Sequence, residues 1–363
     1  MKACLNGVRR LGTLSAIALL AASSVASQPL LANDADAAVD IGEAASEPFV
    51  RADVQAYLQQ FYAKPMPMLT REVLEQIHKL PPAAIAAMAA SDLPVGEMAV
   101  EREFSMPGPG GPLRLKVFDV RADRKAGPVV VFYHGGGYVV GTIETHAGLA
   151  AEISRQLDLP VVSVDYRLAP ENPWPAAPDD GEAAARWIAA NGKTLGLDVT
   201  GLVLTGDSAG GNLTLITAAA LRDKPAAVPV VLQMPIYPAT DFVKAYPSQA
   251  LFAKGYALDA SSTELMRGHY AADDDSLRTS PLLGQLEGLP PTVLVTASLD
   301  PLRDQGRAYG AKLIEAGVPM LFYEGKGLIH GFATYRKAIP SAQDDTVAFL
   351  KLARAMLDDM AAE

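Results

Sequence analysis

The chain reads LVLTGDSAGGN at residues 202–212, and this stretch decides its fold. Its first four residues are apolar or β-branched and predict a buried strand, whereas residues 212–221 suit a helix. A strand that turns into a helix within a few residues strains the backbone, and the glycines at 206 and 210 keep side chains out of the crowded turn. Ser208 is therefore expected at the carboxyl end of the strand with its hydroxyl exposed. The alternative is an ordinary helix cap.

The composition fits one large α/β domain with a small appendage. The chain has 363 residues, of which 50% are hydrophobic, with 30 glycines and 27 prolines. Its formal net charge is −10, which argues against binding to nucleic acid or to an anionic membrane by charge alone. The single cysteine, Cys4, lies near the N-terminus, so the rest of the chain cannot form a disulfide.

Residues 1–26 predict a secretory signal peptide. Three basic residues precede an apolar core at 11–22, and small residues at 24–26 form a cleavage pattern. The core has 12 residues, fewer than the ~20 that a membrane-spanning helix needs. Cleavage would change the net charge from −10 to −13, because the segment holds three positive charges and no negative ones. We expect an exported protein, periplasmic or secreted, with no membrane span in its mature form; an uncleaved amphipathic anchor is the alternative.

The next segments differ in pattern. Residues 27–48 carry five acidic residues and no lysine or arginine, which predicts a disordered acidic leader. Residues 49–97 show helical spacing, as at Val54, Tyr57 and Phe61, and predict two or three short helices that form an N-terminal cap segment. Residues 239–275 interrupt the later rhythm of strands and helices and are a possible second cap segment.

Apolar runs that alternate with helical patterns predict the sheet. Two β-rich segments, at 98–104 and 113–120, flank a turn-forming run of proline and glycine. Six near-continuous apolar runs follow, as is typical of parallel strands covered on both faces. They span residues 129–133, 161–166, 202–205, 230–234, 292–296 and 320–323. The predicted fold class is α/β, with a mostly parallel sheet of about eight strands.

Three consecutive glycines follow the strand at 129–133, in the sequence HGGGY at residues 134–138. Such glycines let a substrate approach the peptide N–H groups. In acyl transfer these N–H groups would hold the oxyanion, and one lost donor typically costs about 3 kcal/mol. The alternatives are a flexible loop or a phosphate cradle. A nucleotide is the weaker of these, because the spacing does not fit G-x-G-x-x-G and no Lys-Ser/Thr pair follows.

A nucleophilic serine needs a base, and the chain has five histidines. Four of them lie in other segments. His78 is in the N-terminal cap segment, His146 begins a helical pattern, and His269 is in the second cap segment. His134 belongs to the glycine loop, where its ring would brace the loop. His330 follows the last expected strand on a glycine-flanked loop at the carboxyl edge of the sheet, where active groups converge. His330 is therefore the candidate base.

The acid that would orient this histidine is expected after another strand. Asp300 follows the strand at 292–296 and precedes Pro301. An alternative makes Asp300 the N-cap of a helix that begins at Pro301, and both roles can coexist. Asp304 would lie one turn into that helix and is the lesser candidate.

Together these motifs resemble the hormone-sensitive-lipase-like branch of the α/β-hydrolases, the bacterial family IV esterases. The matching segments lie within roughly residues 50–360 and are HGGGY at 134–138, DYRLAPE at 165–171, GDSAGG at 206–211, DPL at 300–302 and HGF at 330–332. Proteins of this fold order their triad as serine, acid and histidine, and the chain follows that order. The resemblance implies an α/β-hydrolase catalytic domain at 98–363, a helical N-terminal cap, and neither a metal nor an organic cofactor.

The resemblance also implies roles for single residues. Ser208 would be the nucleophile, His330 the base and Asp300 its partner. The oxyanion hole would be formed by the backbone N–H groups of Gly136, Gly137 and Ala209. Glu171 and Asp207 match motif positions that are structural in the family.

The expected function is hydrolysis of carboxylic esters through an acyl-enzyme, and the resemblance suggests short acyl chains and soluble small-molecule esters. The same three residues could instead serve amide hydrolysis or acyl transfer. A different alternative is ligand binding without catalysis, as in the plant gibberellin receptors, which share this fold. The resemblance implies that those receptors have lost the catalytic histidine, whereas His330 is present here. We expect a monomer or homodimer with no nucleic-acid partner.

Overall fold

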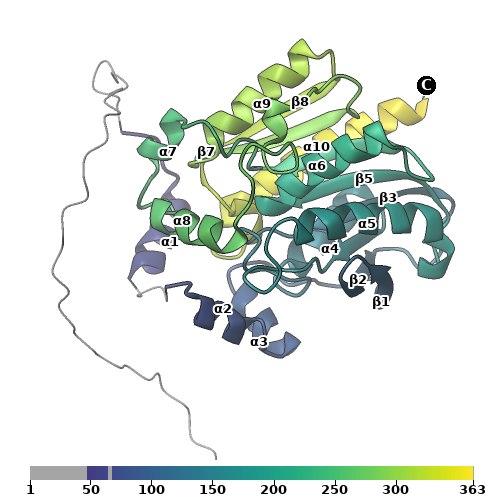
Figure 1. The fold of residues 1–363 in the computed structure, drawn as a ribbon, viewed down its shortest axis with the longest axis horizontal. Coiled ribbons are helices and arrows are strands. Elements are labelled where there is room, and N and C mark those ends of the chain that lie inside the picture. Colours follow the sequence, from purple (N-terminus) through teal and green to yellow (C-terminus); the bar gives the residue numbers. More distant parts are fainter. Residues whose placement is uncertain (1–46, 64–67, 363) are drawn as a thin grey trace, which may run out of the picture. The chain divides into compact units, whose positions relative to one another are not determined.

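Helices cover both faces of one eight-stranded sheet (Figure 1). The structure is a computed structural model that describes residues 47–63 and 68–362. The predicted signal peptide and all but the last two residues of the predicted leader therefore lie outside the described residues. The strands are β1 (Val100–Gly108), β2 (Gly111–Asp119), β3 (Gly127–Tyr133), β4 (Val161–Val164), β5 (Val199–Asp207), β6 (Val230–Ile236), β7 (Thr292–Leu299) and β8 (Met320–Ile329).

The strands lie in the order β1-β2-β4-β3-β5-β6-β7-β8. β1 and β2 run antiparallel to their neighbours, and every pair from β4 to β8 is parallel. The prediction of a mostly parallel sheet of about eight strands is confirmed. Central strands such as β4 and β5 are almost wholly buried because helices pack on both sides, which is why apolar residues predominate in their sequences.

The longer helices divide between the two faces of the sheet. One face carries α5 (Ala176–Asn191), α6 (Ala209–Asp223) and α9 (Arg303–Glu315), and the other carries α4 (Ala147–Leu157) and α10 (Pro340–Ala362). Each face has its own cluster of buried apolar side chains. The 3-10 turns are η1 (Ala87–Ala89), η2 (Gly192–Leu195), η3 (Pro281–Leu283) and η4 (Phe332–Thr334).

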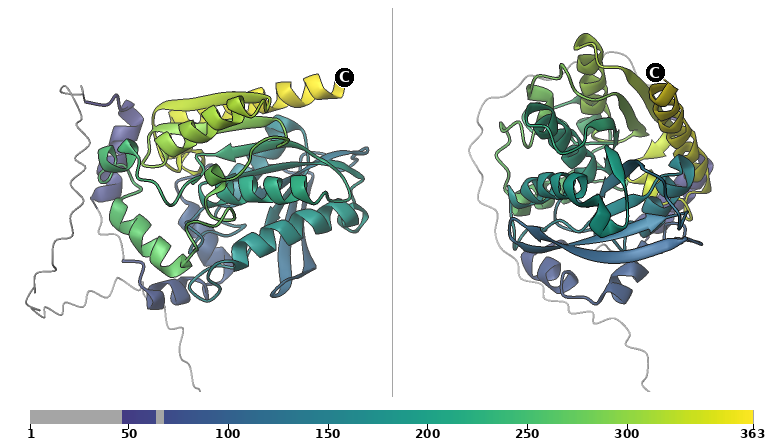
Figure 2. Two further views of the ribbon diagram at one scale, coloured as in Figure 1. Left: turned by 45° about the horizontal axis from the view of Figure 1, so that its top comes forward. Right: turned by 90° about the vertical axis from the view of Figure 1, so that its right-hand side faces the viewer.

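The two cap segments lie at the carboxyl end of the parallel strands (Figure 2). The N-terminal cap segment contains α1 (Ala52–Tyr62), α2 (Arg71–Ile77) and α3 (Pro82–Ala86), and the second contains α7 (Pro247–Leu251) and α8 (Ala260–Tyr270). The segments touch each other: the Tyr62 hydroxyl lies 2.7 Å from an Asp259 carboxylate oxygen, and His269 Nε2 lies 2.9 Å from the Leu69 carbonyl oxygen. None of the helices within the described ranges is long and apolar enough to cross a membrane.

Both ends of the N-terminal cap segment are bonded to the chain between residues 336 and 345. At its start, Arg51 forms an ion pair with Asp345 at 2.5 Å. At its end, Asp92 receives two hydrogen bonds, of 2.8 and 2.9 Å, from the guanidinium of Arg336, and both side chains are buried. The Ser91 carbonyl also accepts two backbone N–H groups from residues 337 and 338. This segment is therefore fixed to the stretch that follows His330.

Candidate active site

Ser208 lies on the turn between β5 and α6 in a conformation that few residues other than glycine adopt. Its φ of 56° and ψ of −115° place it in a strained region of the backbone map. A Cβ atom at Gly206 or Gly210 would overlap the carbonyl oxygen of Tyr133, so the turn requires glycine on both sides. Ser208 stands at the N-cap position of α6, but its side chain does not cap the helix. The hydroxyl is free to bond elsewhere.

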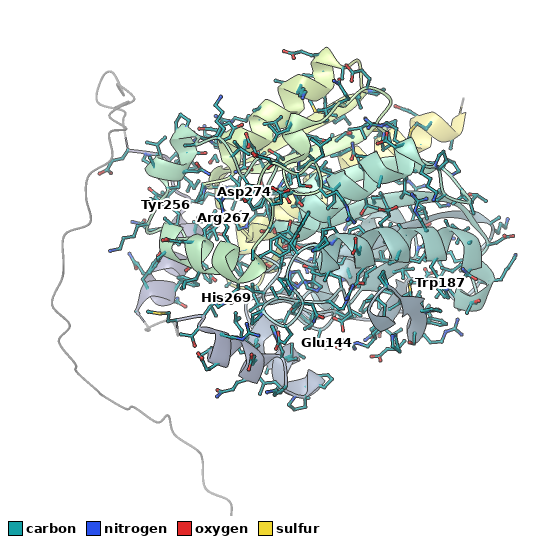
Figure 3. The ribbon with its side chains drawn as sticks, viewed as in Figure 1. Glu144, Trp187, Tyr256, Arg267, His269 and Asp274 are labelled. Carbon is teal, nitrogen blue, oxygen red and sulfur yellow. The ribbon has the colours of Figure 1, made fainter. Side chains whose placement is uncertain are left out.

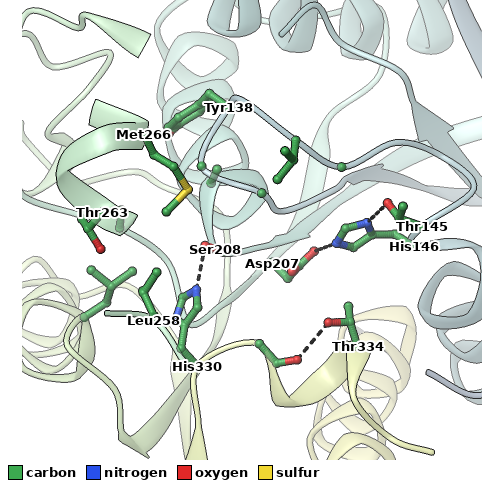
Figure 4. A pocket seen from close by; sticks show the side chains of 18 of the residues that line it. Tyr138, Thr145, His146, Asp207, Ser208, Leu258, Thr263, Met266, His330 and Thr334 are labelled. Atoms are coloured by element: carbon green, nitrogen blue, oxygen red, sulfur yellow. Dashed lines mark hydrogen bonds and ion pairs between the residues drawn. The ribbon is translucent and has the colours of Figure 1, made fainter. Parts of the chain in front are cut away.

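The structure brings Ser208, His330 and Asp300 together, as Figure 4 shows for the first two. Ser208 Oγ lies 2.8 Å from His330 Nε2, and His330 Nδ1 lies 2.7 Å from Asp300 Oδ2. The three residues come from the ends of β5, β8 and β7, which meet at one edge of the sheet. Both Asp300 and His330 are buried. The arrangement allows the imidazole to take a proton from the hydroxyl while the carboxylate fixes its tautomer.

Helix α9 begins after Pro301, so it does not start where the N-cap alternative for Asp300 placed it. α9 starts at Arg303, and its N-cap is Leu302, so the interpretation of Asp300 as a helix N-cap before Pro301 is wrong. Asp300 instead closes a short turn, in which its Oδ1 accepts the Leu302 N–H at 2.7 Å. Asp304, the lesser candidate, pairs with Arg303 and accepts the Ser248 N–H. It makes no hydrogen bond to His330.

The glycine loop after β3 lies beside the nucleophile with its amides uncommitted. Gly136 and Gly137 have φ angles of 119° and 60°, which side chains disfavour. Within residues 47–63 and 68–362, neither of their N–H groups donates a hydrogen bond. Ala209, the third predicted donor, is the first residue of α6, where helix N–H groups lack partners within the helix. All three residues line the same cavity as Ser208, so their amides could receive an oxyanion there.

Two buried polar side chains, Asp207 and His146, support the glycine loop. Asp207 Oδ1 accepts the Gly135 N–H at 2.9 Å and lies 3.5 Å from His146 Nε2. Burial opposes ionisation of both side chains, yet their mutual attraction holds the pKa of Asp207 below its usual value and that of His146 above it. The fully buried His134, by contrast, has a pKa lowered to about 3 by burial and by His146. His134 is therefore neutral near pH 7, and its ring braces the loop by stacking on Tyr166 with centroids 4.2 Å apart.

The reactive groups open into a cavity of about 540 Å³ that both cap segments line. From the N-terminal cap segment come Tyr57, Phe61, Met88, Ala89 and Ser91; from the second come Ala239, Asp241, Phe242, Gln249, Leu258, Thr263, Met266, Arg267 and Tyr270. The Met266 sulfur occupies the space where a Cβ on Gly137 would stand, directly over the glycine loop. Arg267, also on α8, pairs with Asp274 at 2.5 Å (Figure 3).

Sequence reasoning missed several of these lining residues. The second cap segment has no clear period, so nothing in its sequence separates Met266 from its neighbours. Asp207 matches a structural motif position and His146 begins a helical pattern, but no signal in the sequence pairs the two. The other histidines lie away from Ser208: His78 bonds Glu171 at 2.8 Å and the Val139 carbonyl oxygen at 2.8 Å, and His269 bonds Leu69. In the part of the chain that the structure describes, no group of three potential ligands could hold a metal ion.

Comparison with known proteins agrees with this geometry. A family model for the alpha/beta hydrolase fold matches residues 130–334. The esterase LipI of Mycobacterium tuberculosis is 36% identical over 70% of this chain and 82% of its own length. The chain belongs to the hormone-sensitive-lipase-like esterases. An arylesterase of Saccharolobus solfataricus is 33% identical over 77% of the chain and 91% of its own length.

Solved structures of other hydrolases share the fold of this chain. An α/β-hydrolase enzyme from the metagenome of Lake Arreo, Spain, superposes with a TM-score of 0.77 at 32% identity, over 85% of this chain and 99% of that one. A hyperthermophilic esterase from Pyrobaculum calidifontis gives a TM-score of 0.74 at 33% identity, over 87% and 100%. The chain is accordingly a carboxylesterase, a serine hydrolase of carboxylic esters.

Proposed function

We propose that this esterase hydrolyses short-chain acyl esters through an acyl-enzyme on Ser208, with His330 as general base and Asp300 as its orienting acid. The observation that carries the proposal is the pair of hydrogen bonds that joins the three side chains, 2.8 Å from Ser208 to His330 and 2.7 Å from His330 to Asp300. The strained backbone of Ser208 also supports it, because such strain is kept where surrounding structure enforces it at functional sites.

The reaction proceeds in two halves. Ser208 Oγ attacks the ester carbonyl carbon while His330 Nε2 takes the hydroxyl proton, and the carbonyl oxygen becomes an oxyanion held by the N–H groups of Gly136, Gly137 and Ala209. The oxyanion collapses, the bond to the alcohol oxygen breaks, and His330 gives its proton to the departing alcohol. Water then attacks the acyl group with the same imidazole as base, and the acid leaves with Ser208 restored.

The side chain of Met266, which lies over the glycine loop, supports a preference for short acyl chains. Met266 fills the region beside Gly137, so a chain that extends from the carbonyl on that side meets its side chain after few carbons. The cavity is lined largely by aromatic and aliphatic side chains, which suit apolar substituents of a soluble ester.

The test replaces the nucleophile. Ser208→Ala is expected to reduce turnover of nitrophenyl acetate to the background rate with an unchanged circular dichroism spectrum. A serine-directed phosphonate should label the parent enzyme and not the variant. Ser163→Ala is the matched control, since Ser163 is a buried β4 serine whose hydroxyl has no hydrogen-bond partner among the described residues. Substantial turnover by Ser208→Ala would contradict the proposal.

Amidase and acyltransferase activities use the same three residues and are separated by product analysis. With nitrophenyl acetate and added methanol, a hydrolase releases mainly acetate, whereas an acyltransferase accumulates methyl acetate. Nitroanilide turnover at a rate near that of the matching ester would favour the amidase.

We propose further that the protein is exported to the periplasm or beyond. The support is the pattern of residues 1–26, with its basic start, apolar core and small residues before the cleavage site. Expression with and without residues 1–26, followed by fractionation and N-terminal sequencing, tests it. Export of the full chain with a new N-terminus near residue 27 or 28 is the expected result, and an uncleaved N-terminus in the cytoplasmic fraction would contradict it.

A further inference from the structure

The aromatic ring of Tyr237 lies against the imidazole of His330. Their centroids are 4.8 Å apart, and the planes are tilted by 57°. Tyr237 is the first residue after β6 and is 1% exposed. The ring of Phe332 packs against it in an edge-to-face arrangement, with centroids 5.3 Å apart. The tyrosine is thus enclosed between the reactive histidine and the core.

The backbone holds this ring in place at a conformational cost. Tyr237 has a φ of 35°, in the left-handed region that L-residues rarely adopt. Its N–H donates to the Val295 carbonyl oxygen at 2.7 Å, and the preceding carbonyl, of Ile236, accepts the Ser208 N–H at 2.8 Å. Two successive residues at the end of β6 therefore fix the nucleophile's amide and the ring beside the base. Strain of this kind is characteristic of functional sites.

The ring of Tyr237, and not its hydroxyl, is the part that meets the reactive group. The hydroxyl is near the backbone of Ala333 but makes no hydrogen bond within residues 47–63 and 68–362. An unpartnered buried hydroxyl weakens the folded state. Phenylalanine would therefore keep the contact with His330 and relieve that cost.

We propose that Tyr237 is a positioning residue that holds the His330 ring and stabilises its protonated form through the aromatic ring. The inference rests on the proposed function, in which His330 becomes an imidazolium when it takes the Ser208 proton. A cation that lies over the face of an aromatic ring, within about 6 Å of its centroid, is attracted by the negative charge of that face, and the 4.8 Å between the two centroids meets this distance. The other charged or titratable groups near this pair are Asp300 after β7, Asp207 at the end of β5 and Tyr335 after β8.

The test changes the electron density of the ring while keeping its shape. Tyr237→Phe is expected to retain kcat and KM and to melt at an equal or higher temperature. Successive fluorination of that phenylalanine should lower kcat stepwise, by about two- to thirtyfold in total, with little change in KM. The acidic limb of the kcat/KM profile should move to lower pH along the same series, because a weaker ring stabilises the imidazolium less. A purely structural role would leave both readouts unchanged.

Tyr237→Leu removes the ring and should match or exceed the effect of full fluorination. Tyr309→Leu is its control, since Tyr309 is an equally buried tyrosine on α9; it should lower stability without moving the acidic limb. Unchanged kcat and unchanged pH profiles across the fluorinated series would overturn the proposal, as would a loss in Tyr237→Phe as large as in Tyr237→Leu. Absence of Ser208-dependent turnover in the parent enzyme would contradict the proposed function instead, so the two failures are distinguishable.

Discussion

The two carboxylate oxygens of Asp300 bond to different groups: Oδ2 lies 2.7 Å from His330 Nδ1, and Oδ1 accepts the Leu302 N–H at 2.7 Å. One side chain therefore orients the imidazole and is itself held by the turn that leads into α9. The second bond helps to fix the carboxylate, which in turn fixes the imidazole tautomer.

Asp300→Asn separates these two tasks. The amide oxygen can still accept the Leu302 N–H, so the turn should survive, but the side chain no longer stabilises an imidazolium. We expect kcat to fall by about 10³- to 10⁴-fold, with KM nearly unchanged. Steady-state kinetics measures this. Asp304→Asn is the control, and it should retain most of the activity because Asp304 bonds Arg303 and Ser248 and not His330.

Met266→Ala should lengthen the acyl chain that the enzyme prefers. The substitution opens space over Gly137, where the methionine sulfur now lies. Since each buried methylene contributes about 0.8 kcal/mol, room for two more should raise the kcat/KM of hexanoate relative to butyrate esters about tenfold. A nitrophenyl ester series gives the ratio. Met266→Phe should shift it the opposite way, and Leu277→Ala, at an exposed position, should leave it unchanged.

His134 should make the protein less stable in mild acid. Its folded-state pKa of about 3 lies below the ordinary 6.5, so the unfolded chain binds a proton that the folded chain excludes. The stability it contributes is complete above about pH 6.5 and is lost as the pH falls towards 3, by about 2–3 kcal/mol between pH 7 and 4.5. His146, whose pKa is raised, is protonated in both states over most of that window and adds little to the loss.

Urea unfolding at several pH values measures the free energy of unfolding of the parent and of His134→Asn. The difference between the two gives the contribution of His134 to the pH dependence. Asparagine keeps a donor for the Gly135 carbonyl oxygen, which His134 Nδ1 now meets at 2.8 Å. The variant should be less stable at pH 7 and should lose less stability on acidification. Parallel pH dependences would contradict the assignment of His134 as a buried neutral side chain.

Asp207→Ala should damage both stability and turnover. It leaves His146 without its buried charge partner and removes the shorter of the two hydrogen bonds of the Gly135 N–H, that of 2.9 Å; breaking a buried ion pair in this way typically costs about 3–5 kcal/mol. Asp207→Asn keeps an oxygen for Gly135 and should be milder in both respects. If the glycine loop shifts, kcat should fall more than KM rises, since the amides of that loop act on the transition state. Equal stability of the parent and Asp207→Ala would contradict this account.

Much of this architecture follows from the sequence, for physical reasons. Each apolar run marked a strand because parallel strands here are buried on both faces. β8 extends six residues beyond its predicted end at Tyr323, since its polar and glycine residues still pair with β7. Ser208, Asp300 and His330 were predictable because each directly follows a strand at the same edge. Met266 and Tyr237 were not, because their importance arises only when α8 and β6 are placed in space.

The tethering of the N-terminal cap segment limits how a substrate can enter. Arg51 is bonded to Asp345 at one end and Asp92 to Arg336 at the other, so the segment is anchored twice to the same short region of the chain. It cannot swing outward as a hinged flap without breaking a buried ion pair. An ester must therefore reach Ser208 without outward rotation of the whole segment.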